Sequence, residues 1–279
     1  MSAFYKTIII SAQGGIARVT IDNDPVNVLS LQMMAELTSF LENVKDDETI
    51  KVVIFDSANP DFFIAHVDMT IAEDPKAFET LAAFALPGLN PFQTLSERVR
   101  RLPQVTIVQL EGVARGGGAE FVAAADMSFA AIGRGALGQP EALMGIVPGG
   151  AGTQYLRHRV GRNKALEILL GADLFDAQTA ERYGWINRAI PADTIGAFVD
   201  NLAQNIAALP DGVIAAAKRV VPADDYGAGL ESENTAWASL FTQPPAGQLL
   251  LGGLKRGAQT PEVERKIEVM LRELATELQ

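Results

Sequence analysis

Three consecutive glycines, Gly116 to Gly118, constrain the fold of this chain more than any other feature of its sequence. They follow a strand-like run, Val105–Leu110, and precede a helix-forming run, Ala119–Ala125. Glycine adopts backbone angles that other residues avoid, and the first N–H groups of a helix have no partner inside the helix. The order strand, glycine turn, helix therefore predicts an α/β unit whose free backbone N–H groups point at whatever occupies the turn.

Such a turn favours the binding of a negatively charged group, and its sequence narrows the kind of group. No Lys-Ser or Lys-Thr follows the glycines, which excludes a phosphate loop, and no G-x-G-x-x-G is present here, which excludes the dinucleotide fingerprint. An oxyanion site remains. A purely structural interpretation stays open beside it, in which the glycines only permit close packing of strand and helix.

Two glutamates accompany the turn. Glu120 stands in the first helical turn, where the helix dipole favours its ionised form. Glu141 follows Pro140 in an apolar segment bounded by proline and glycine, so its carboxylate is expected to be desolvated. Two carboxylates beside an oxyanion site suit general acid and base catalysis. Taken singly, Glu120 is equally typical of a capping acid and Glu141 of a surface acid.

Strand-like and helix-like segments alternate through the first half of the chain, which is typical of an α/β protein. Gly14-Gly15 predicts a hairpin between the first two strands, and the segment from Asp56 to Asp68 is expected to be a loop. The segment 74–102 is helix-prone but interrupted by prolines, and its apolar part, Phe78–Leu95, is expected to form core, a pocket wall or a lid. The other expected strands and the first helix are Tyr5–Ser11, Ile16–Ile21, Val52–Phe55, Met127–Ala131 and Leu31–Val44.

Beyond residue 150 the patterns become helical. The final helix has a strong start signal at Thr260-Pro261-Glu262. The expected helices are Asn163–Leu170, Asp176–Tyr183, Asp193–Ala208, Asp211–Val221, Leu230–Phe241 and Glu262–Leu278.

Composition excludes several classes of protein. The 279 residues carry 23 Lys and Arg against 34 Asp and Glu, a net charge of −11, which is the wrong sign for a nucleic-acid binder. With no cysteine and only two histidines, neither a disulfide framework nor a thiolate or histidine-rich metal site is expected. The apolar run at the N-terminus is too short for a signal peptide, and the longest charge-free stretch, Thr80 to Ser96, is too short and too rich in proline to span a membrane. A cytoplasmic protein without membrane contact is the default expectation.

Taken in order, the motifs resemble the crotonase family, also called the enoyl-CoA hydratase/isomerase superfamily. The resemblance covers roughly residues 5–245 and is weak from about 246 to 279. The segments that carry it are VTIDNDPVNVLSLQMMAEL, FFIAHVDM, VQLEGVARGGGAEFVAAADMSFA, LGQPEALMGIVPGGAGTQYLRHRVGRNKALEILL and GADLFDAQTAERYGWINRAIP.

The resemblance implies an α/β spiral of ββα units over residues 1–205 and a helical oligomerisation region over 206–279 that forms trimers or dimers of trimers. It implies an acyl-CoA thioester as substrate, with coenzyme A entering as part of that substrate and no separate cofactor or metal. The thioester oxygen would be held by the backbone N–H groups of Val67 and Gly117. The positions that would contact the coenzyme A thioester are Pro25, Val26, Ala65, Val67, Asp68, Met69, Gly117 and Pro140.

Glu120 and Glu141 stand where hydratases of this family place their two glutamates. The resemblance therefore favours an enoyl-CoA hydratase, with Glu120 activating water and Glu141 protonating the α-carbon. An isomerase needs only the second carboxylate, and Met144–Thr153 lacks the aspartate of dienoyl isomerases and dehalogenases. Isomerisation, thioester hydrolysis, C–C cleavage and a non-catalytic acyl-CoA-binding trimer stay open as alternatives.

The sequence departs from the family pattern in the first oxyanion loop. His66 replaces the usual glycine, and it could act in the pocket or be a histidine that merely packs with its ring nitrogens hydrogen-bonded. Val67 is β-branched, which narrows the turn. Met69-Thr70 replaces the basic residue that many hydratases carry beside the adenine. Candidate phosphate ligands are then Arg98, Arg100, Arg101, Lys255 and Arg256, each also consistent with a solvated surface, while His158 is expected on the surface.

Overall fold

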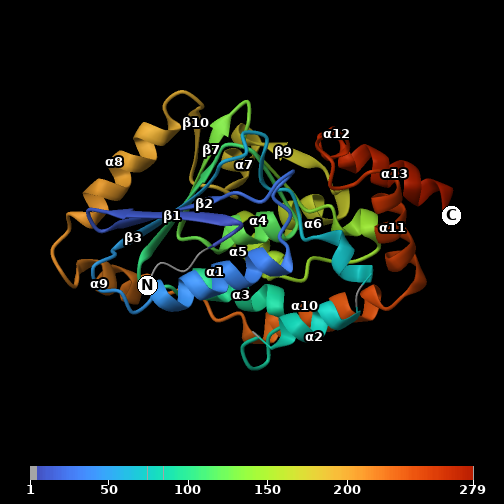
Figure 1. Ribbon diagram of the computed structural model, residues 1–279, viewed down its shortest axis with the longest axis horizontal. Coiled ribbons are helices and arrows are strands. Elements are labelled where there is room, and N and C mark those ends of the chain that lie inside the picture. The colour runs from blue at the N-terminus through green and yellow to red at the C-terminus, as the bar shows by residue number, and fades with distance from the viewer. Residues whose placement is uncertain (1–4, 74, 84, 279) are drawn as a thin grey trace.

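A computed structural model describes residues 5–73, 75–83 and 85–278 of the chain (Figure 1). Its centre is a six-stranded sheet with the strand order β1-β2-β3-β5-β7-β10. Only the β1–β2 hairpin is antiparallel, and the remaining neighbours are parallel. The strands are β1 (Ile8–Gln13), β2 (Ile16–Ile21), β3 (Val52–Ser57), β5 (Val105–Leu110), β7 (Met127–Ile132) and β10 (Arg188–Pro191).

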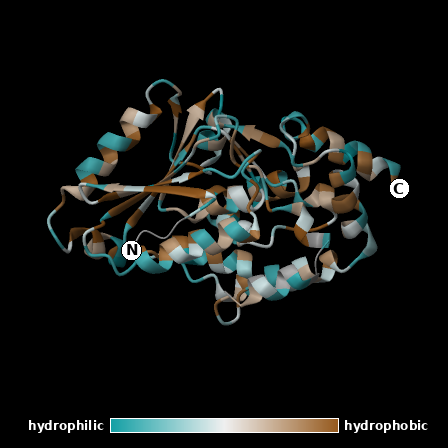
Figure 2. Cartoon of the chain, in the orientation of Figure 1, coloured by the Kyte–Doolittle hydropathy of each residue, from teal (hydrophilic) through white to brown (hydrophobic). Residues whose placement is uncertain are grey.

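Successive apolar side chains of the central strands point to opposite faces of this sheet, and each face packs against its own hydrophobic core. In β5, Ile107 packs toward helix α8 (Ile195–Ala207) and Val108 packs toward the opposite core. Every residue of β5 is buried, as expected for a parallel strand with helices on both faces. Figure 2 shows these strands as the hydrophobic centre of the molecule, with more hydrophilic helices around them.

Helix α8 covers one face of the sheet, and α1 (Leu31–Val44), α3 (Pro91–Arg100) and α4 (Gly117–Ala124) lie on the other (Figure 1). The Ser30 hydroxyl caps α1 by accepting from the Met33 N–H. Asn90 and Gln93 form a reciprocal capping box at the start of α3. These caps fix the N-termini of α1 and α3.

A smaller sheet of short strands lies beside the first, with the order β4-β6-β8-β9. Each turn of the chain gives one strand to each sheet and then a helix: β3 with β4, β5 with β6, and β7 with β8. The predicted α/β spiral of ββα units is therefore confirmed. The bounds of the short strands are Phe62–Ile64 for β4, Val113–Arg115 for β6, Ala136–Gly138 for β8 and Leu174–Asp176 for β9.

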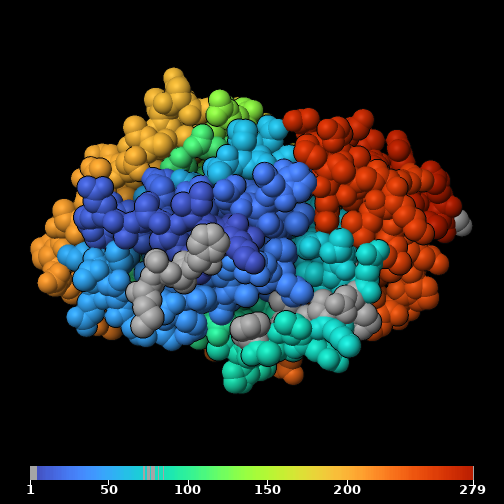
Figure 3. All heavy atoms as spheres, viewed as in Figure 1, coloured from blue at the N-terminus to red at the C-terminus, as the bar shows by residue number. Residues whose placement is uncertain are grey.

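Helices dominate the remainder of the chain, as predicted. The C-terminal helices α11, α12 and α13 form one end of the molecule (Figures 1 and 3). The predicted boundary between core and oligomerisation region, at residue 205, falls within α8 and stays a prediction. The remaining helices are η1 (Met69–Glu73), α2 (Pro75–Ala82), η2 (Glu141–Met144), α5 (Gly152–Val160), α6 (Arg162–Gly171), α7 (Ala177–Tyr183), α9 (Val213–Val220), α10 (Gly227–Phe241), α11 (Pro244–Lys255), α12 (Pro261–Glu264) and α13 (Ile267–Glu277).

The structure corrects three of the expected elements. The loop expected between Asp56 and Asp68 contains the buried strand β4. Helix α11 lies where no helix was expected. The single helix expected over Glu262–Leu278 is two helices, because the chain breaks at Arg265 and Lys266. Within the described residues, no helix is long and apolar enough to cross a membrane.

Close approach between α4 and β4 gives a first prediction. A Cβ on Gly118 would press into the Ile64 carbonyl oxygen and lie 2.8 Å from the Ile64 Cβ, whereas a Cβ on Gly247 in α11 would meet nothing within 4 Å. We expect Gly118→Ala to lower the free energy of unfolding by about 1–3 kcal/mol. Gly247→Ala, the matched helical control, should raise it by about 0.5–1 kcal/mol. Urea unfolding measures both, and equal effects would contradict the packing described.

Candidate active site

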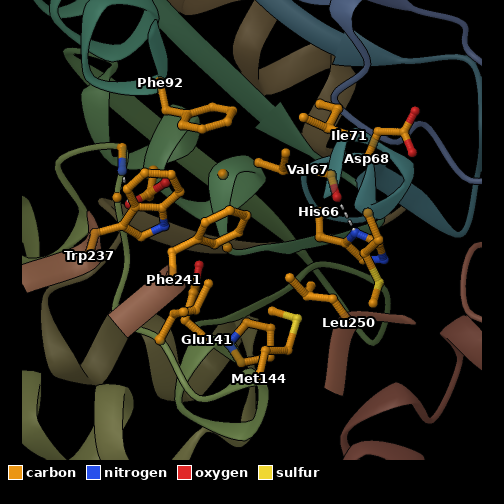
Figure 4. Close-up of a pocket in the computed structure, with 18 residues that line it drawn as sticks. His66, Val67, Asp68, Ile71, Phe92, Glu141, Met144, Trp237, Phe241 and Leu250 are labelled. Carbon is orange, nitrogen blue, oxygen red and sulfur yellow. Dashed lines mark hydrogen bonds between the residues drawn. The ribbon is translucent and has the colours of Figure 1, made fainter. Parts of the chain in front are cut away.

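A cavity of about 90 Å³ opens where the two sheets, the glycine turn (Gly116–Gly118) and the C-terminal helices meet. Figure 4 shows the Phe92, Trp237 and Phe241 rings on one side of it and His66 and Val67 across from them. The cavity is lined by His66, Val67, Asp68, Met69, Ile71, Phe92, Gly116, Gly117, Glu120, Pro140, Glu141, Met144, Ile146, Gly149, Gly150, Trp237, Phe241 and Leu250.

Hydrogen bonding at the glycine turn fixes the direction of the Gly117 N–H. The Gly116 carbonyl accepts from the Glu120 N–H at 2.9 Å, so this carbonyl points along α4. In a trans peptide the next N–H points the opposite way. The Gly117 N–H therefore points out of the N-terminus of α4, where helix geometry leaves it without an intrahelical partner. Gly116 has a φ of +49°, which favours glycine at this position.

The same logic fixes the N–H of Val67 in the donor loop, residues 65–69. The His66 carbonyl accepts from the Leu29 N–H at 2.8 Å, and the Asp68 N–H donates to the Leu29 carbonyl at 3.2 Å. In this parallel bridge, the two peptide groups that flank Val67 each direct one hydrogen-bonding group toward Leu29. The Val67 N–H consequently points away from Leu29.

The donor loop and the glycine turn are in direct contact. A Cβ on Gly117 would lie 2.7 Å from the Val67 Cγ2 and 3.4 Å from the Leu29 Cδ2. Both residues line the same cavity. The predicted pair of N–H donors is thus brought together, and Val67, the unusual β-branched residue, packs against the place where a side chain on Gly117 would be.

Glu120 reaches the cavity from the first turn of α4 and is almost fully buried. Its Oε1 accepts from the backbone N–H groups of Gly150 and Gly152, at 2.8 and 2.9 Å. Burial raises the pKa of Glu120 well above its usual value, and the nearby charges of Glu141 and Glu233 raise this pKa further. The two backbone donors oppose this by favouring the carboxylate.

Glu141 begins η2 at the opposite side of the glycine turn. A Cβ on Gly116 would lie 2.7 Å from the Glu141 Oε1, so a side chain at Gly116 would displace this carboxyl group. The Gln139 side-chain amide, oriented with its nitrogen toward Glu141, donates to both carboxyl oxygens, at 2.9 and 3.1 Å. Burial raises the pKa of Glu141 to about 8. The desolvation expected from its sequence context is confirmed.

A third buried carboxylate, Glu233 of α10, was missed by the sequence analysis. It accepts from the N–H groups of Ala151 (2.7 Å) and Thr153 (3.0 Å), from the Thr153 hydroxyl and from Gln93. It thereby fixes the segment whose glycine N–H groups hold Glu120. Its sequence signal was its spacing, because Leu230, Glu233 and Trp237 follow one another at helical intervals on a single face.

The remaining predicted contact positions divide into two groups. Asp68, Met69 and Pro140 line the cavity together with Val67 and Gly117. Val26 and Ala65 are buried in a separate small cluster with Phe62, and the Ala65 N–H donates to the Val26 carbonyl. Pro25 is exposed and lies outside the cavity lining.

None of the basic candidates for phosphate binding lines the cavity. Arg98 pairs with Glu42, both Arg100 and Arg101 pair with Glu97, Arg256 pairs with Glu277, and Lys255 is exposed. His158 is on the surface, as expected, and contacts Asp224.

From the interrupted segment 74–102, Phe92 reaches the cavity, as the interpretation as a pocket wall requires. Its ring packs edge-on against Trp237, which stacks on Phe241 at a centroid distance of 4.8 Å. Residues 74 and 84 of this segment lie outside the described residues.

His66 is buried, lines the cavity and makes two contacts through its ring. Nδ1 lies 2.7 Å from the Val67 carbonyl oxygen, and Nε2 lies 2.9 Å from the Oε1 of Glu264 in α12. Both ring nitrogens are therefore hydrogen-bonded, as in the packed-histidine interpretation. Glu264 was not a sequence candidate, although it stands at helical spacing from Ile267 and Leu271 in the sequence.

Comparison with known proteins agrees with this geometry. The sequence profile described as enoyl-CoA hydratase/isomerase matches residues 11–253. The chain belongs to the enoyl-CoA hydratase/isomerase family. The resemblance to crotonases inferred from its motifs is confirmed, and the family membership makes the protein an enzyme of the crotonase type.

Relatives of this enoyl-CoA hydratase/isomerase family member are found in several bacteria. A "probable enoyl-CoA hydratase" of Mycobacterium tuberculosis is 30% identical over 192 residues, which cover 68% of this chain and 71% of that protein. The fatty acid oxidation complex subunit alpha of Vibrio parahaemolyticus is 30% identical over 178 residues, which cover 63% of this chain and 25% of that subunit.

Solved structures of the family share the fold. The crystal structure of a "putative enoyl-CoA hydratase" from Streptomyces avermitilis is 59% identical in sequence, with a TM-score of 0.96 over 98% of this chain and 100% of that chain. The enoyl-CoA hydratase of Bacillus halodurans is 20% identical, with a TM-score of 0.78 over 88% of this chain and 100% of that chain. The second likeness bears on the fold alone.

The raised pKa of Glu141 predicts how stability depends on pH. The unfolded carboxyl group loses its proton near pH 4.5, and the folded one does so only near pH 8. Between these values the folded state holds a proton that the unfolded state has lost, so stability falls with rising pH by up to about 1.4 kcal/mol per pH unit. Glu141→Gln should remove its share of this loss, while Glu120 and Glu233, whose pKa values burial also raises, keep the remainder. Urea unfolding at pH 5, 6.5 and 8 tests it beside Glu231→Gln, an exposed control, and an unchanged slope for Glu141→Gln would contradict it.

Proposed function

We propose that the protein is an enoyl-CoA hydratase, which adds water across the double bond of a trans-2-enoyl-CoA thioester. The observation that carries this proposal is that Glu120 and Glu141, both buried, face one cavity together with the N–H groups of Val67 and Gly117. Hydration needs one group to take a proton and one to give a proton, beside donors for an oxyanion. Each of these three requirements has a candidate in this cavity.

In the proposed reaction, the Glu120 carboxylate takes a proton from water while the water oxygen bonds to the β-carbon. The electron pair of the double bond moves into the thioester, whose oxygen gains enolate charge and accepts from the Val67 and Gly117 N–H groups. The carboxylic acid of Glu141 then gives its proton to the α-carbon. The product is a 3-hydroxyacyl-CoA, and the proton on Glu120 returns to Glu141 or to solvent before the next turnover.

The division of roles follows from the surroundings of the two carboxyl groups. Their mutual repulsion in an apolar cavity favours a state in which the pair holds one proton. Burial raises the pKa of both groups, but two backbone N–H groups donate to Glu120 and stabilise its ionised form, which leaves the shared proton on Glu141, whose pKa is about 8. This arrangement supports Glu120 as the base and Glu141 as the acid.

The buried Glu120 also favours hydration over the alternative crotonase reactions. Double-bond isomerisation moves a proton between two carbons of the substrate and needs only the carboxyl group of Glu141. A second carboxylate, oriented by Gly150 and Gly152, has a use when water is the nucleophile. The acyl end of the substrate would lie against the aromatic group of Phe92, Trp237 and Phe241.

The proposed contacts of the thioester and its pantetheine arm are those predicted from the sequence, with Asp68, Met69 and Pro140 at the cavity. A trimer or dimer of trimers and a cytoplasmic location stay predictions. The exposed apolar side chains Val220 and Val221, at the end of helix α9, are consistent with an assembly that covers them.

Substitution of the two glutamates tests the reaction directly. We expect Glu120→Gln and Glu141→Gln each to lower kcat by about 10²–10⁴, because each removes one proton-transfer group. The measurement is the loss of the conjugated thioester absorbance of trans-2-butenoyl-CoA and a medium-chain homologue. Glu231→Gln serves as the control. A wild-type protein that binds these thioesters without hydrating them would overturn the proposal, and isomerisation of a 3-enoyl-CoA by Glu120→Gln would favour the isomerase alternative.

The pH dependence of the reaction gives an independent test. Glu141 acts as an acid, so it must be protonated, and its pKa is about 8. We expect kcat/KM for trans-2-butenoyl-CoA to fall above about pH 8, by tenfold per pH unit at the limit. The residual activity of Glu141→Gln should lack this alkaline limb. A limb that persists in Glu141→Gln would assign the acid to another group.

A further inference from the structure

The donor loop is held by a turn of the C-terminal segment. The Met69 N–H donates to the Gln259 Oε1 at 2.6 Å, and the Gln259 N–H donates to the Glu264 Oε1 at 2.8 Å. That same Glu264 oxygen contacts the His66 Nε2 at 2.9 Å. The family profile ends at residue 253, so Gln259 and Glu264 lie outside the matched region.

The same segment also reaches the strand before the glycine turn. Arg115, the last residue of β6, donates from Nε to the Glu268 Oε1 at 2.5 Å, and its guanidinium lies 3.8 Å from the Glu264 carboxylate. The side chains of Arg115 and Glu264 have no exposed surface, that of His66 is 5% exposed, and that of Glu268 is 13% exposed. A buried charge cluster thus joins both loops that carry the proposed N–H donors.

Hydrogen bonding and charge define the state of His66 within this cluster. A carbonyl oxygen can only accept, so Nδ1 carries a proton and donates to the Val67 carbonyl. Nε2 faces a carboxylate and also donates. With His66 as an imidazolium, two positive and two negative groups balance, whereas a neutral His66 would leave one buried negative charge uncompensated.

We propose that His66 and Glu264 form a positioning pair, in which the protonated imidazole, anchored by Glu264, sets the Val67 N–H for the oxyanion. This deepens the proposed function and rests on it, since the oxyanion in question is that of the acyl-CoA thioester. Neither residue needs to touch the substrate for this role.

The contacts of His66 explain how positioning works. Its carbonyl, bound to the Leu29 N–H, fixes the peptide plane that contains the Val67 N–H. Its imidazole, bound to the Val67 carbonyl, fixes the next peptide plane. Leu29 holds the peptide planes on both sides of Val67 through the backbone, and the His66 ring, itself fixed by Glu264, adds a second contact to the plane that follows Val67. Losing the anchor frees the ring, leaves that plane held by Leu29 alone and loosens the direction of the donor.

The pair also bears on Glu141. The charged groups that face His66 are Glu264 from α12, Arg115 from β6 and Glu141 from η2. Burial lowers the pKa of His66, but Glu264 and the Val67 carbonyl together outweigh burial and raise this pKa overall. The positive charge of His66 lowers the pKa of Glu141, against the larger effect of burial. Removing this charge should move the alkaline limb to higher pH, which a purely structural role of His66 would not do.

Two variants and one control test the proposal. His66→Ala removes the ring, and Glu264→Gln keeps the shape of its side chain but lets His66 lose its proton. The control, Arg272→Gln, removes an exposed contact of α13 with Asp173 and lies outside the cavity lining. Acetoacetyl-CoA is the probe, because its bound enolate absorbs in the near ultraviolet and requires the oxyanion donors but not hydration. The second readout is the pH profile of kcat and KM for trans-2-butenoyl-CoA.

We expect His66→Ala and Glu264→Gln to lower the enolate formation constant by about ten- to hundredfold, as a misplaced donor should. kcat should fall in parallel with little change in KM, and the alkaline limb should rise above that of the wild type. Circular dichroism confirms folding, and Glu264→Gln keeps the test informative if His66→Ala does not fold. The proposal would be overturned if His66→Ala and Glu264→Gln formed the enolate as well as Arg272→Gln does and had their alkaline limb at the same pH. If the wild type forms the enolate but hydrates no enoyl-CoA, the proposed function fails while a His66-dependent enolate still supports the pair.

Discussion

The close packing of α4 on β4 is the constraint on which the rest of the site depends. The backbone of Gly118 lies so near the Ile64 carbonyl that no side chain fits between them. This approach brings the N-terminus of α4 against the loop that follows β4. Two backbone segments separated by about fifty residues in sequence then present N–H groups to one cavity, and each N–H is aimed by a hydrogen bond on the far side of its peptide group. The glycines thus serve close packing and the site at once, so the two interpretations of the triplet are not exclusive.

Three buried carboxylates close to one another lower the stability of the folded state, and they differ in how many hydrogen-bond donors compensate each of them. Glu233 is surrounded by donors from Gln93, Ala151 and Thr153, and it contributes order to the segment around Glu120. Glu120 receives two backbone donors. Glu141 has the fewest partners and a pKa near neutrality. Burial raises the pKa of all three carboxyl groups, and the donors around Glu120 and Glu233 oppose this increase.

Much of the fold could be predicted from the sequence because its central strands are long and apolar and its helices have regular spacing. Val105–Leu110 and Met127–Ile132 are strands of this kind. β4, with three residues, could not be recognised, because a segment that short is defined only by its pairing with β6. The break at Arg265 likewise depends on tertiary contacts, since the helical pattern continues across it.

The candidate site was predicted where local motifs report it and missed where tertiary contacts create it. Glu120, Glu141, Val67 and Gly117 were found from motifs and now lie around one cavity. Glu233 and Glu264 were missed because each looks like one more acid on a helix. Both side chains are nevertheless buried, and a buried acidic residue requires polar or charged partners. For Glu233 the helical spacing with Leu230 and Trp237 was a signal, whereas the four-residue helix of Glu264 has no apolar stripe.

The contact between His66 and Glu264 has a consequence for biosynthesis, because the two residues are separated by 198 positions in the chain. A ribosome releases the sheets, the glycine turn and both proposed catalytic glutamates before it releases Glu264. During that interval His66 has no buried counter-ion, and the donor loop lacks its contact with Gln259. A nascent chain can therefore have its core in place while the cavity still awaits the segment that orders it, which delays any chemistry until that segment has emerged.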